Sequence, residues 1–459
     1  MLFFPVVTLL YYLVDYRWRW LLLLLASCYF YMVFIPAYIL ILFAIIAIDY
    51  TAAIWMEKLP GKKKIFLLLS IVANLSLLAV FKYYNFFTGN VNALLELLNV
   101  HISPLPVWKI ILPVGLSFHT FQAMSYTIEV YRGHQKAEKH FGIYALYVMF
   151  YPQLVAGPIE RPSQLLPQFY KKHDADYDGI IRGLKMMLWG FFMKVVVADR
   201  LALYVDYVYA HAEWHGRLAL IISVFFYSFQ IYGDFAGYSL IAIGAAKTIG
   251  FTLEDNFHQP YLSASITEFW RRWHITLSGW FRDYVYIPLG GNRNGPARYL
   301  FNILLVFLLS GLWHGAKWTF VVWGLLHGFF IVLEFFLGKK IKGSRTAGIG
   351  YSFIIVSLCW VFFRSASLHD AMGFIGRIFN PATPWVVAGE FNARILLVYS
   401  FFGIACVLAA DFRKAFLNRD NLLLHHKKTG IRLVSCVAIL VLIVLLGVFD
   451  GAQFIYFQF

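Results

Sequence analysis

The 459-residue chain has a composition that soluble globular proteins do not show. Hydrophobic residues make up 61% of the chain and charged residues 14%, whereas soluble domains contain about 45–50% and about 25%. The formal net charge of +15 does not indicate a nucleic-acid partner, because excess Lys and Arg in a membrane protein reflects orientation and contact with anionic headgroups. The composition predicts an integral membrane protein whose first partners are lipids.

Apolar runs of bilayer length recur from one end of the chain to the other. A helix needs ~20 residues to cross a bilayer. About eleven runs approach that length, namely residues 20–35, 36–56, 65–85, 107–128, 184–198, 216–231, 297–313, 317–337, 348–363, 393–410 and 431–449. Segments 1–14 and 141–157 would bring the number to about thirteen. The sequence therefore predicts an all-α polytopic membrane protein with about 11–13 transmembrane or re-entrant helices, in one domain over residues 1–459.

Basic clusters predict the orientation of these helices. Residues 58–64, 338–345 and 413–428 are rich in Lys and Arg. Two expected spans separate the first cluster from residues 15–19, and two separate the second cluster from the third, so each pair should lie on one face. Positively charged loops stay in the cytoplasm. We expect that face to be cytoplasmic, with residues 450–459 outside.

The longest interruption of the apolar pattern lies at about residues 265–298. Ser265 followed by Glu268 is a capping-box pattern that predicts a helix from about Ile266. On such a helix one arc collects apolar side chains (Ile266, Phe269, Trp270, Trp273, Leu277, Trp280, Phe281 and Tyr284), and Arg271, Ser278 and Arg282 line another. This pattern favours an amphipathic helix that lies in the membrane interface.

The turn-rich loop "YIPLGGNRNGPAR", residues 286–298, follows that helix. Its Asn and Arg side chains, Arg293 among them, could present donors to an anion. Binding of lipid headgroups alone is an equally acceptable interpretation of these arginines. His274 falls on the border between the aromatic and basic arcs of the preceding helix.

The stretch "LLSGLWHGAKWTFVVWGLLHG", residues 308–328, places histidines inside apolar sequence. An ionisable group at membrane depth is costly, so His314 is a candidate functional residue. Gly311 and Gly315 beside it should leave room for a substrate. With a thioester donor and a hydroxyl acceptor, His314 could act as general base. A buried histidine bonded to a carbonyl, or a proton relay in a transporter, are the alternatives.

No metal site is expected from these histidines. His327 follows His314 by 13 residues, which on one continuous helix means ~20 Å of rise. The chain also lacks HExxH and GxSxG motifs, so the patterns of zinc and serine hydrolases are missing.

Two motifs together resemble the membrane-bound O-acyltransferase superfamily, most closely its bacterial branch of polysaccharide O-acetylation proteins. They are "FWRRWHITLSGWFRDYVYIPLGGNRNG" at 269–295 and "SGLWHGAKWTFVVWGLLHG" at 310–328. Further matching stretches are residues 112–133, 150–168, 232–251, 255–270 and 360–371. The similarity extends over nearly the whole chain.

The resemblance implies tilted helices around a central tunnel, in which His314 is the catalytic histidine and His274 its partner in the site. It also implies O-acyl transfer, here O-acetyl transfer, from a cytosolic thioester toward a cell-surface or periplasmic polysaccharide. Acetyl-CoA or an acyl carrier would be a co-substrate, with no tightly bound cofactor. A separate secreted acetyltransferase would receive the acyl group.

Weaker expectations concern substrate and donor contacts, which we assign to Arg271, Arg282, Arg293, Asn256 and Asp234. The competing function is a transporter or flippase of an acylated or anionic intermediate. That class is typified by repeated halves with broken helices and paired intramembrane charges, and the sequence shows no such internal repeat.

Overall fold

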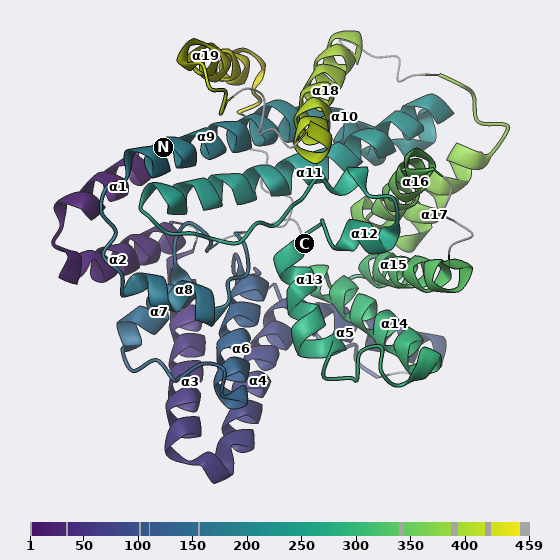
Figure 1. Cartoon of the computed structure of the whole chain (residues 1–459). Coiled ribbons are helices and arrows are strands. Elements are labelled where there is room, and N and C mark those ends of the chain that lie inside the picture. The colour runs from purple at the N-terminus through teal and green to yellow at the C-terminus, as the bar shows by residue number, and fades with distance from the viewer. Residues whose placement is uncertain are drawn as a thin grey trace. The chain divides into compact units, whose positions relative to one another are not determined.

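The structure is a computed structural model that describes residues 2–33, 35–100, 102–109, 111–154, 157–338, 344–386, 393–417 and 424–449. Regular secondary structure in these residues is helical, and one isolated antiparallel bridge joins Phe257 to Trp273. The helices divide into two compact units (Figure 1), Met1–Arg182 with Ala245–Glu254, and Gly183–Gly244 with Asp255–Phe459. The expected single domain stays a prediction.

Unit 1 is built around three long helices that pack on one another. Its helices are α1 (Phe3–Leu13), α2 (Arg19–Met32), α3 (Ile39–Lys58), α4 (Lys63–Leu78), α5 (Tyr84–Leu97), α6 (Leu116–Arg132), α7 (Phe141–Met149) and α8 (Pro162–Phe169). Helices α3, α4 and α6 contact each other extensively. Asp49 of α3 is buried and accepts hydrogen bonds from Ser70 (2.6 Å) and Asn74 (3.0 Å) of α4. Such polar contacts hold helices together where lipid offers no hydrogen bonds.

Unit 2 carries a large aromatic core. Helices α9 (Tyr177–Phe191) and α11 (Arg217–Thr248) have residues in both units and lie side by side (Figure 1). The others are α10 (Asp199–Ala210), α12 (Ile266–Trp270), α13 (Ile275–Phe281), α14 (Gly295–His314), α15 (Trp318–Leu337), α16 (Arg345–Arg364), α17 (Leu368–Phe379), α18 (Ala393–Leu417) and α19 (Thr429–Leu446). Side chains of α11, α12, α15 and α16 meet in one buried cluster.

Eight of the expected spans are confirmed as helices long and apolar enough to cross a membrane. Among the described residues these are Pro36–Lys58, Pro60–Leu97, Arg217–Thr248, Gly295–His314, Trp318–Leu337, Arg345–Arg364, Ile395–Leu417 and Thr429–Leu446. The long apolar runs therefore predict helix position well, because a bilayer-length run leaves helix as the way to satisfy its backbone groups.

The remaining expected segments form shorter helices. Residues 20–35 give the 14-residue α2, and 107–128 give the 17-residue α6. Gly115 adopts a left-handed conformation, with φ of 73°, immediately before α6 begins. Residues 1–14 and 141–157 give helices of 11 and 9 residues. The apolar run 184–198 is interrupted by a π-helical segment, Phe192–Ala198.

The orientation inferred from basic clusters stays a prediction. Residues 339–343 and 418–423 lie outside the described residues, so the second and third clusters are described only in part. The whole of segment 450–459 also lies outside them.

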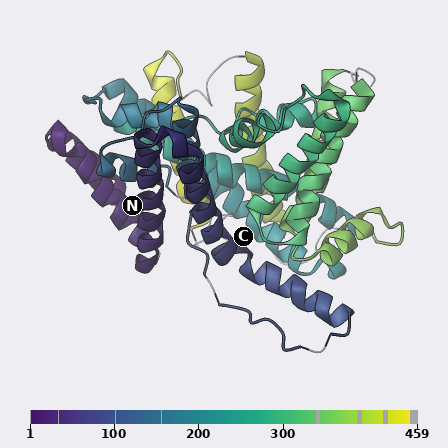
Figure 2. The ribbon, with the colours of Figure 1, turned by 90° about the horizontal axis from the view of Figure 1, so that it is seen from below.

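Helices α14 and α15 form a tight pair, green in Figure 1 and Figure 2. Gly311 of α14 faces Gly324 of α15. A Cβ atom at Gly311 would meet the backbone carbonyl of Phe320, and one at Gly324 would meet that of Phe307. Small residues let two membrane helices approach this closely. The glycines therefore set the position of His314, which ends α14.

Gly311→Val should separate α14 from α15 and lower the thermal midpoint of the purified protein. Overfilling a packed interior costs about 1–3 kcal/mol, and here the obstacle is backbone, which cannot rotate away. Gly350→Val on α16 is the matched control, because a Cβ there meets no atom within 4 Å. Equal midpoints for the two variants, measured by fluorescence-detected thermal unfolding in detergent, would contradict the close pairing.

Candidate active site

His314 is the last residue of α14 and is buried among aromatic side chains. Its imidazole lies 4.9 Å from the ring of Trp313, 5.0 Å from Trp323 and 5.3 Å from Phe363, measured between centroids. All three rings stand nearly perpendicular to the imidazole. The structure thus places the residue singled out by sequence in an aromatic box, which excludes bulk water and fixes the ring.

The glycines beside His314 do not leave room for a substrate, so that expectation was wrong. The space next to Gly311 is filled by the backbone of α15, and the space next to Gly315 by the side chain of Phe320. Their small size serves helix packing, because α15 could not approach α14 past larger side chains.

The assumption that His314 and His327 share one continuous helix was also wrong. The chain leaves helical geometry after His314 and α15 starts at Trp318, so α15 returns along α14. His327 consequently lies beside the same tryptophan as His314, with 5.0 Å between the centroids of His327 and Trp323. The ~20 Å rise of one straight helix therefore does not give the distance between His314 and His327.

The expected single amphipathic helix is broken into two. α12 starts at Ile266, as predicted, because the Ser265 hydroxyl accepts from the Glu268 amide (3.0 Å). The Glu334 carboxylate also accepts from the amides of Ile266 (2.5 Å) and Thr267 (3.0 Å). Helical geometry is lost at residues 271–274, and α13 begins at Ile275.

The aromatic arc of this segment faces the protein interior and not the lipid. Phe269 and Trp273 are buried in the core of unit 2, and Trp280 and Phe281 are buried as well. The periodicity identified the apolar face correctly, but the same periodicity is expected for a face that packs on protein or on acyl chains.

His274 sits at the break between α12 and α13 in a left-handed conformation, with φ of 44°. A side-chain-bearing residue held there costs of order 1–3 kcal/mol, and such residues cluster at functional sites. Its Nδ1 is 3.3 Å from Oδ1 of Asn256, which also accepts from the Thr276 hydroxyl (2.7 Å). Burial lowers the pKa of His274 to about 3. The ring is therefore neutral near pH 7.

One tryptophan connects the two histidines. The Trp313 ring lies 4.9 Å from the ring of His314 and 6.0 Å from that of His274. The ring of Phe235 on α11 lies 4.6 Å from the His274 ring, measured between centroids. The structure thus brings both predicted histidines to Trp313, and Asn256 lies against one of them, His274.

Asp234 of α11 lies in a buried ion-pair cluster. Its carboxylate is 2.6 Å from Nζ of Lys194, which also contacts Asp199 at 2.7 Å. The sequence analysis missed Lys194, although a lysine inside the apolar run 184–198 is the kind of signal that marks an intramembrane partner. The ion pair gives Asp234 a structural role, and the expected donor contact stays a prediction.

The three arginines assigned to the donor have exposed side chains. Arg271 follows α12, and Arg293 lies in the loop before α14. Arg282 pairs with its neighbour Asp283 at 2.7 Å, yet 66% of its side chain is exposed. An exposed pair of this kind contributes little to stability, so each of the three can meet an anion.

Comparison with known proteins decides the family. The model of the membrane-bound O-acyltransferase family matches residues 8–364. The chain belongs to that family. This acyltransferase is 38% identical to a probable alginate O-acetylase of Pseudomonas putida over 83% of its own length and 78% of the relative. It is 36% identical to a peptidoglycan O-acetyltransferase of Helicobacter pylori over 76% and 72%. A teichoic acid D-alanyltransferase of Streptococcus thermophilus is 29% identical over 51% and 61%.

The family membership, together with eight helices of spanning length among the described residues, makes this acyltransferase a multi-pass membrane protein. The transporter alternative had called for paired intramembrane charges, and Lys194 with Asp234 of α11 is one such pair. The pair is compatible with either class, whereas the family match over most of the chain indicates acyl transfer.

Proposed function

We propose that this acyltransferase moves an acetyl group from acetyl-CoA, supplied on the cytoplasmic side, to a hydroxyl group destined for a cell-surface or periplasmic polysaccharide. The observation that carries the proposal is the placement of His314 and His274 beside the same tryptophan, Trp313, within a chain of this family. Relatives named for alginate and peptidoglycan support a polysaccharide acceptor.

In the proposed reaction His314 is the general base. It takes the proton of the acceptor hydroxyl while the oxygen attacks the thioester carbonyl carbon, and a new carbon–oxygen bond forms. The tetrahedral intermediate then expels the thiolate by breaking the carbon–sulfur bond, and the imidazolium returns the proton to sulfur. A positioned histidine contributes about 10²–10⁴-fold to such a step.

His274 acts in this scheme as a neutral polar group. With a pKa lowered to about 3 it stays uncharged through the physiological range. Asn256 holds its Nδ1 side at 3.3 Å and fixes the ring orientation. A neutral imidazole offers one donor and one acceptor, so it can orient the acceptor hydroxyl toward His314 without competing for its proton.

The membrane and the partners follow from the same proposal. We place the protein in the inner membrane of a bacterium, with basic residues such as those at 62–64 in the cytoplasm. The acyl group leaves on the opposite face, where a secreted acetyltransferase would transfer it to the glycan.

Base-labile acetyl esters on envelope polysaccharide should disappear when the gene is deleted and return with the wild-type gene. Unchanged ester content after deletion would contradict the proposal.

Charge reversal at Arg293 should raise the Michaelis constant for acetyl-CoA more than it lowers turnover. The phosphates of the donor would lose a contact that is present in both ground and transition states. The effect should weaken with ionic strength, since exposed charges are screened. Steady-state kinetics of Arg293→Glu at low and at physiological salt measures the Michaelis constant for acetyl-CoA, the turnover, and the dependence of each on ionic strength.

Lys172→Glu is the control for this prediction, because Lys172 is likewise an exposed cation, paired with Asp174 at 2.9 Å, but lies outside the 271–298 segment. If Arg293→Glu and Lys172→Glu have the same donor dependence as wild type, the arginines return to the headgroup-binding interpretation.

A further inference from the structure

Two buried hydrogen-bond donors on α15 have no acceptor among the residues that the structure describes. Trp270 Nε1 donates to Nδ1 of His327 at 3.2 Å. A neutral imidazole that accepts at Nδ1 carries its proton on Nε2. That Nε2–H, and the Nε1–H of Trp323, are both fully buried and find no partner within the described ranges.

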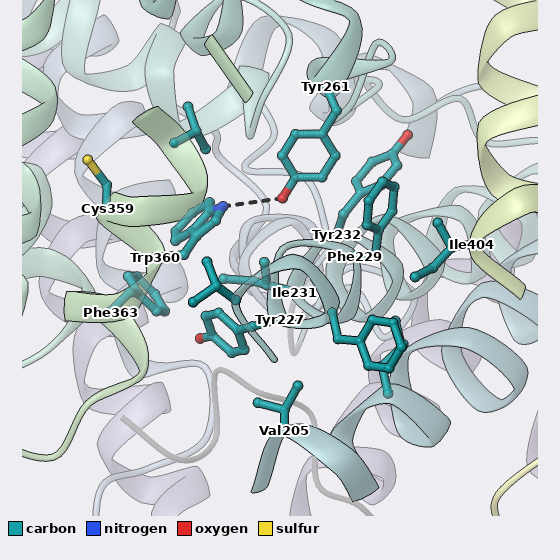
Figure 3. Close-up of a cluster of buried hydrophobic side chains, with 14 of the residues drawn as sticks. Val205, Tyr227, Phe229, Ile231, Tyr232, Tyr261, Cys359, Trp360, Phe363 and Ile404 are labelled. Atoms are coloured by element: carbon teal, nitrogen blue, oxygen red, sulfur yellow. Dashed lines mark hydrogen bonds between the residues drawn. The ribbon is translucent and has the colours of Figure 1, made fainter. Parts of the chain in front are cut away.

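Leaving a buried donor unpaired costs about 1–3 kcal/mol, and native proteins contain few such groups. Two tryptophans of the same aromatic cluster do find acceptors. Trp360 Nε1 donates to the Tyr261 hydroxyl at 3.2 Å (Figure 3), and Trp270 donates to His327. Within the described residues, Trp323 Nε1 and His327 Nε2 are thus unpaired beside groups of the same kind that are paired.

One of the two donors lies beside His314, and the other lies beside that donor. Trp323 and His327 are four residues apart on α15, so their side chains lie on the same face of the helix. The Trp323 ring is 5.0 Å from the His314 ring and 5.0 Å from the His327 ring. The Trp323 N–H therefore belongs to the ring that contacts the proposed general base, and the His327 N–H belongs to the ring that contacts Trp323.

We propose that Trp323 Nε1–H and His327 Nε2–H bind the carbonyl oxygen of the acyl group. This inference rests on the proposed function. When the hydroxyl attacks, the electron pair of the carbonyl moves onto that oxygen, and the two donors stabilise its negative charge. The electron pair re-forms the carbon–oxygen double bond when the carbon–sulfur bond breaks. Fixed donors in a water-excluded site lower such a barrier without reorganisation.

Trp323→Phe removes one N–H and keeps an aromatic ring. Loss of one oxyanion donor reduces turnover by about 10²–10³-fold, and we expect that loss with a nearly unchanged Michaelis constant for acetyl-CoA. Trp360→Phe is the matched control, because it removes the same group where Tyr261 already pairs it. Trp360→Phe should lower the thermal midpoint further than Trp323→Phe and lower turnover less.

A comparison of His327→Gln with His327→Leu tests the second donor, His327 Nε2–H. Glutamine keeps an acceptor for Trp270 and an N–H, so it should retain more turnover than leucine by at least about tenfold. Turnover that is the same in both His327 variants would overturn the role of His327.

The alternative is that a structural water, and not the substrate, accepts from Trp323 Nε1–H. In that case the Trp323 and Trp360 variants should show the opposite pattern. Trp323→Phe would then be destabilised at least as much as Trp360→Phe and would keep turnover within about threefold of wild type, well below the loss of an oxyanion donor. That result, with wild type active and His314→Ala inactive, overturns this inference and leaves the proposed function standing. Absence of acetyl transfer by wild type itself contradicts the proposed function, and the oxyanion assignment with it.

Discussion

His314→Ala should reduce acetyl transfer by at least about 10²-fold, and up to about 10⁴-fold, in purified protein. Without the imidazole no group in the Trp313, Trp323 and Phe363 box can take the proton of the acceptor hydroxyl. Membrane insertion should be unaffected, because removing an ionisable group from a membrane helix lowers its insertion cost. The measurement is the rate of thiol release from acetyl-CoA in the presence of acceptor.

Two further variants separate base chemistry from packing. His314→Gln keeps a polar side chain of similar length but cannot carry a proton between oxygen and sulfur, so it should be as inactive as alanine. His369→Ala on α17 changes an exposed histidine and should match wild type. Substantial activity in His314→Gln would mean that His314 serves only to fill and orient the site.

Lys194→Met should destabilise the protein by about 3–5 kcal/mol, the usual effect of removing one partner of a buried ion pair. Methionine retains the apolar stem but leaves the carboxylates of Asp199 and Asp234, 92% and 96% buried at their side chains, without their cation. The thermal midpoint in detergent should fall strongly, and the yield of folded protein with it.

The controls follow from the geometry of the cluster. Lys194→Arg keeps the charge and should recover most of the stability. Asp199→Asn keeps the 2.6 Å contact between Lys194 and Asp234, so it should cost much less than Lys194→Met. A normal midpoint in Lys194→Met, joined to a raised Michaelis constant for acetyl-CoA, would instead restore the donor contact that sequence had assigned to Asp234.

The sequence predicted the helices better than it predicted their breaks. Apolar runs located the eight spanning helices because their signal is local and long. The break at His274 has no local signature, since the apolar period continues across residues 266–284. That break depends on tertiary contacts, such as the capping of α12 by Glu334 and the bonds that Asn256 makes around His274.

The residues of the candidate site were more predictable than its shape. His314 stood out as an ionisable residue in an apolar run, and the motif similarity added His274 and Asn256. What sequence alone could not supply was the turn after His314, which places Trp323 and His327 beside it. The glycines were misread for the same reason, because the atoms that fill the space beside them come from Phe320 of α15, its backbone beside Gly311 and its side chain beside Gly315.

The central claim is that His314, acting as general base, catalyses the transfer of an acetyl group that starts on a cytoplasmic thioester and ends on a glycan hydroxyl on the other face. Its most direct test supplies acetyl-CoA, isotopically labelled in the acetyl carbons, to the outer surface of inverted membrane vesicles that enclose the acceptor polysaccharide and the secreted partner. We predict labelled acetyl esters on enclosed polysaccharide with wild-type protein and none with His314→Ala at equal protein level. Label that accumulates equally in both vesicle preparations, or in neither, would contradict the claim.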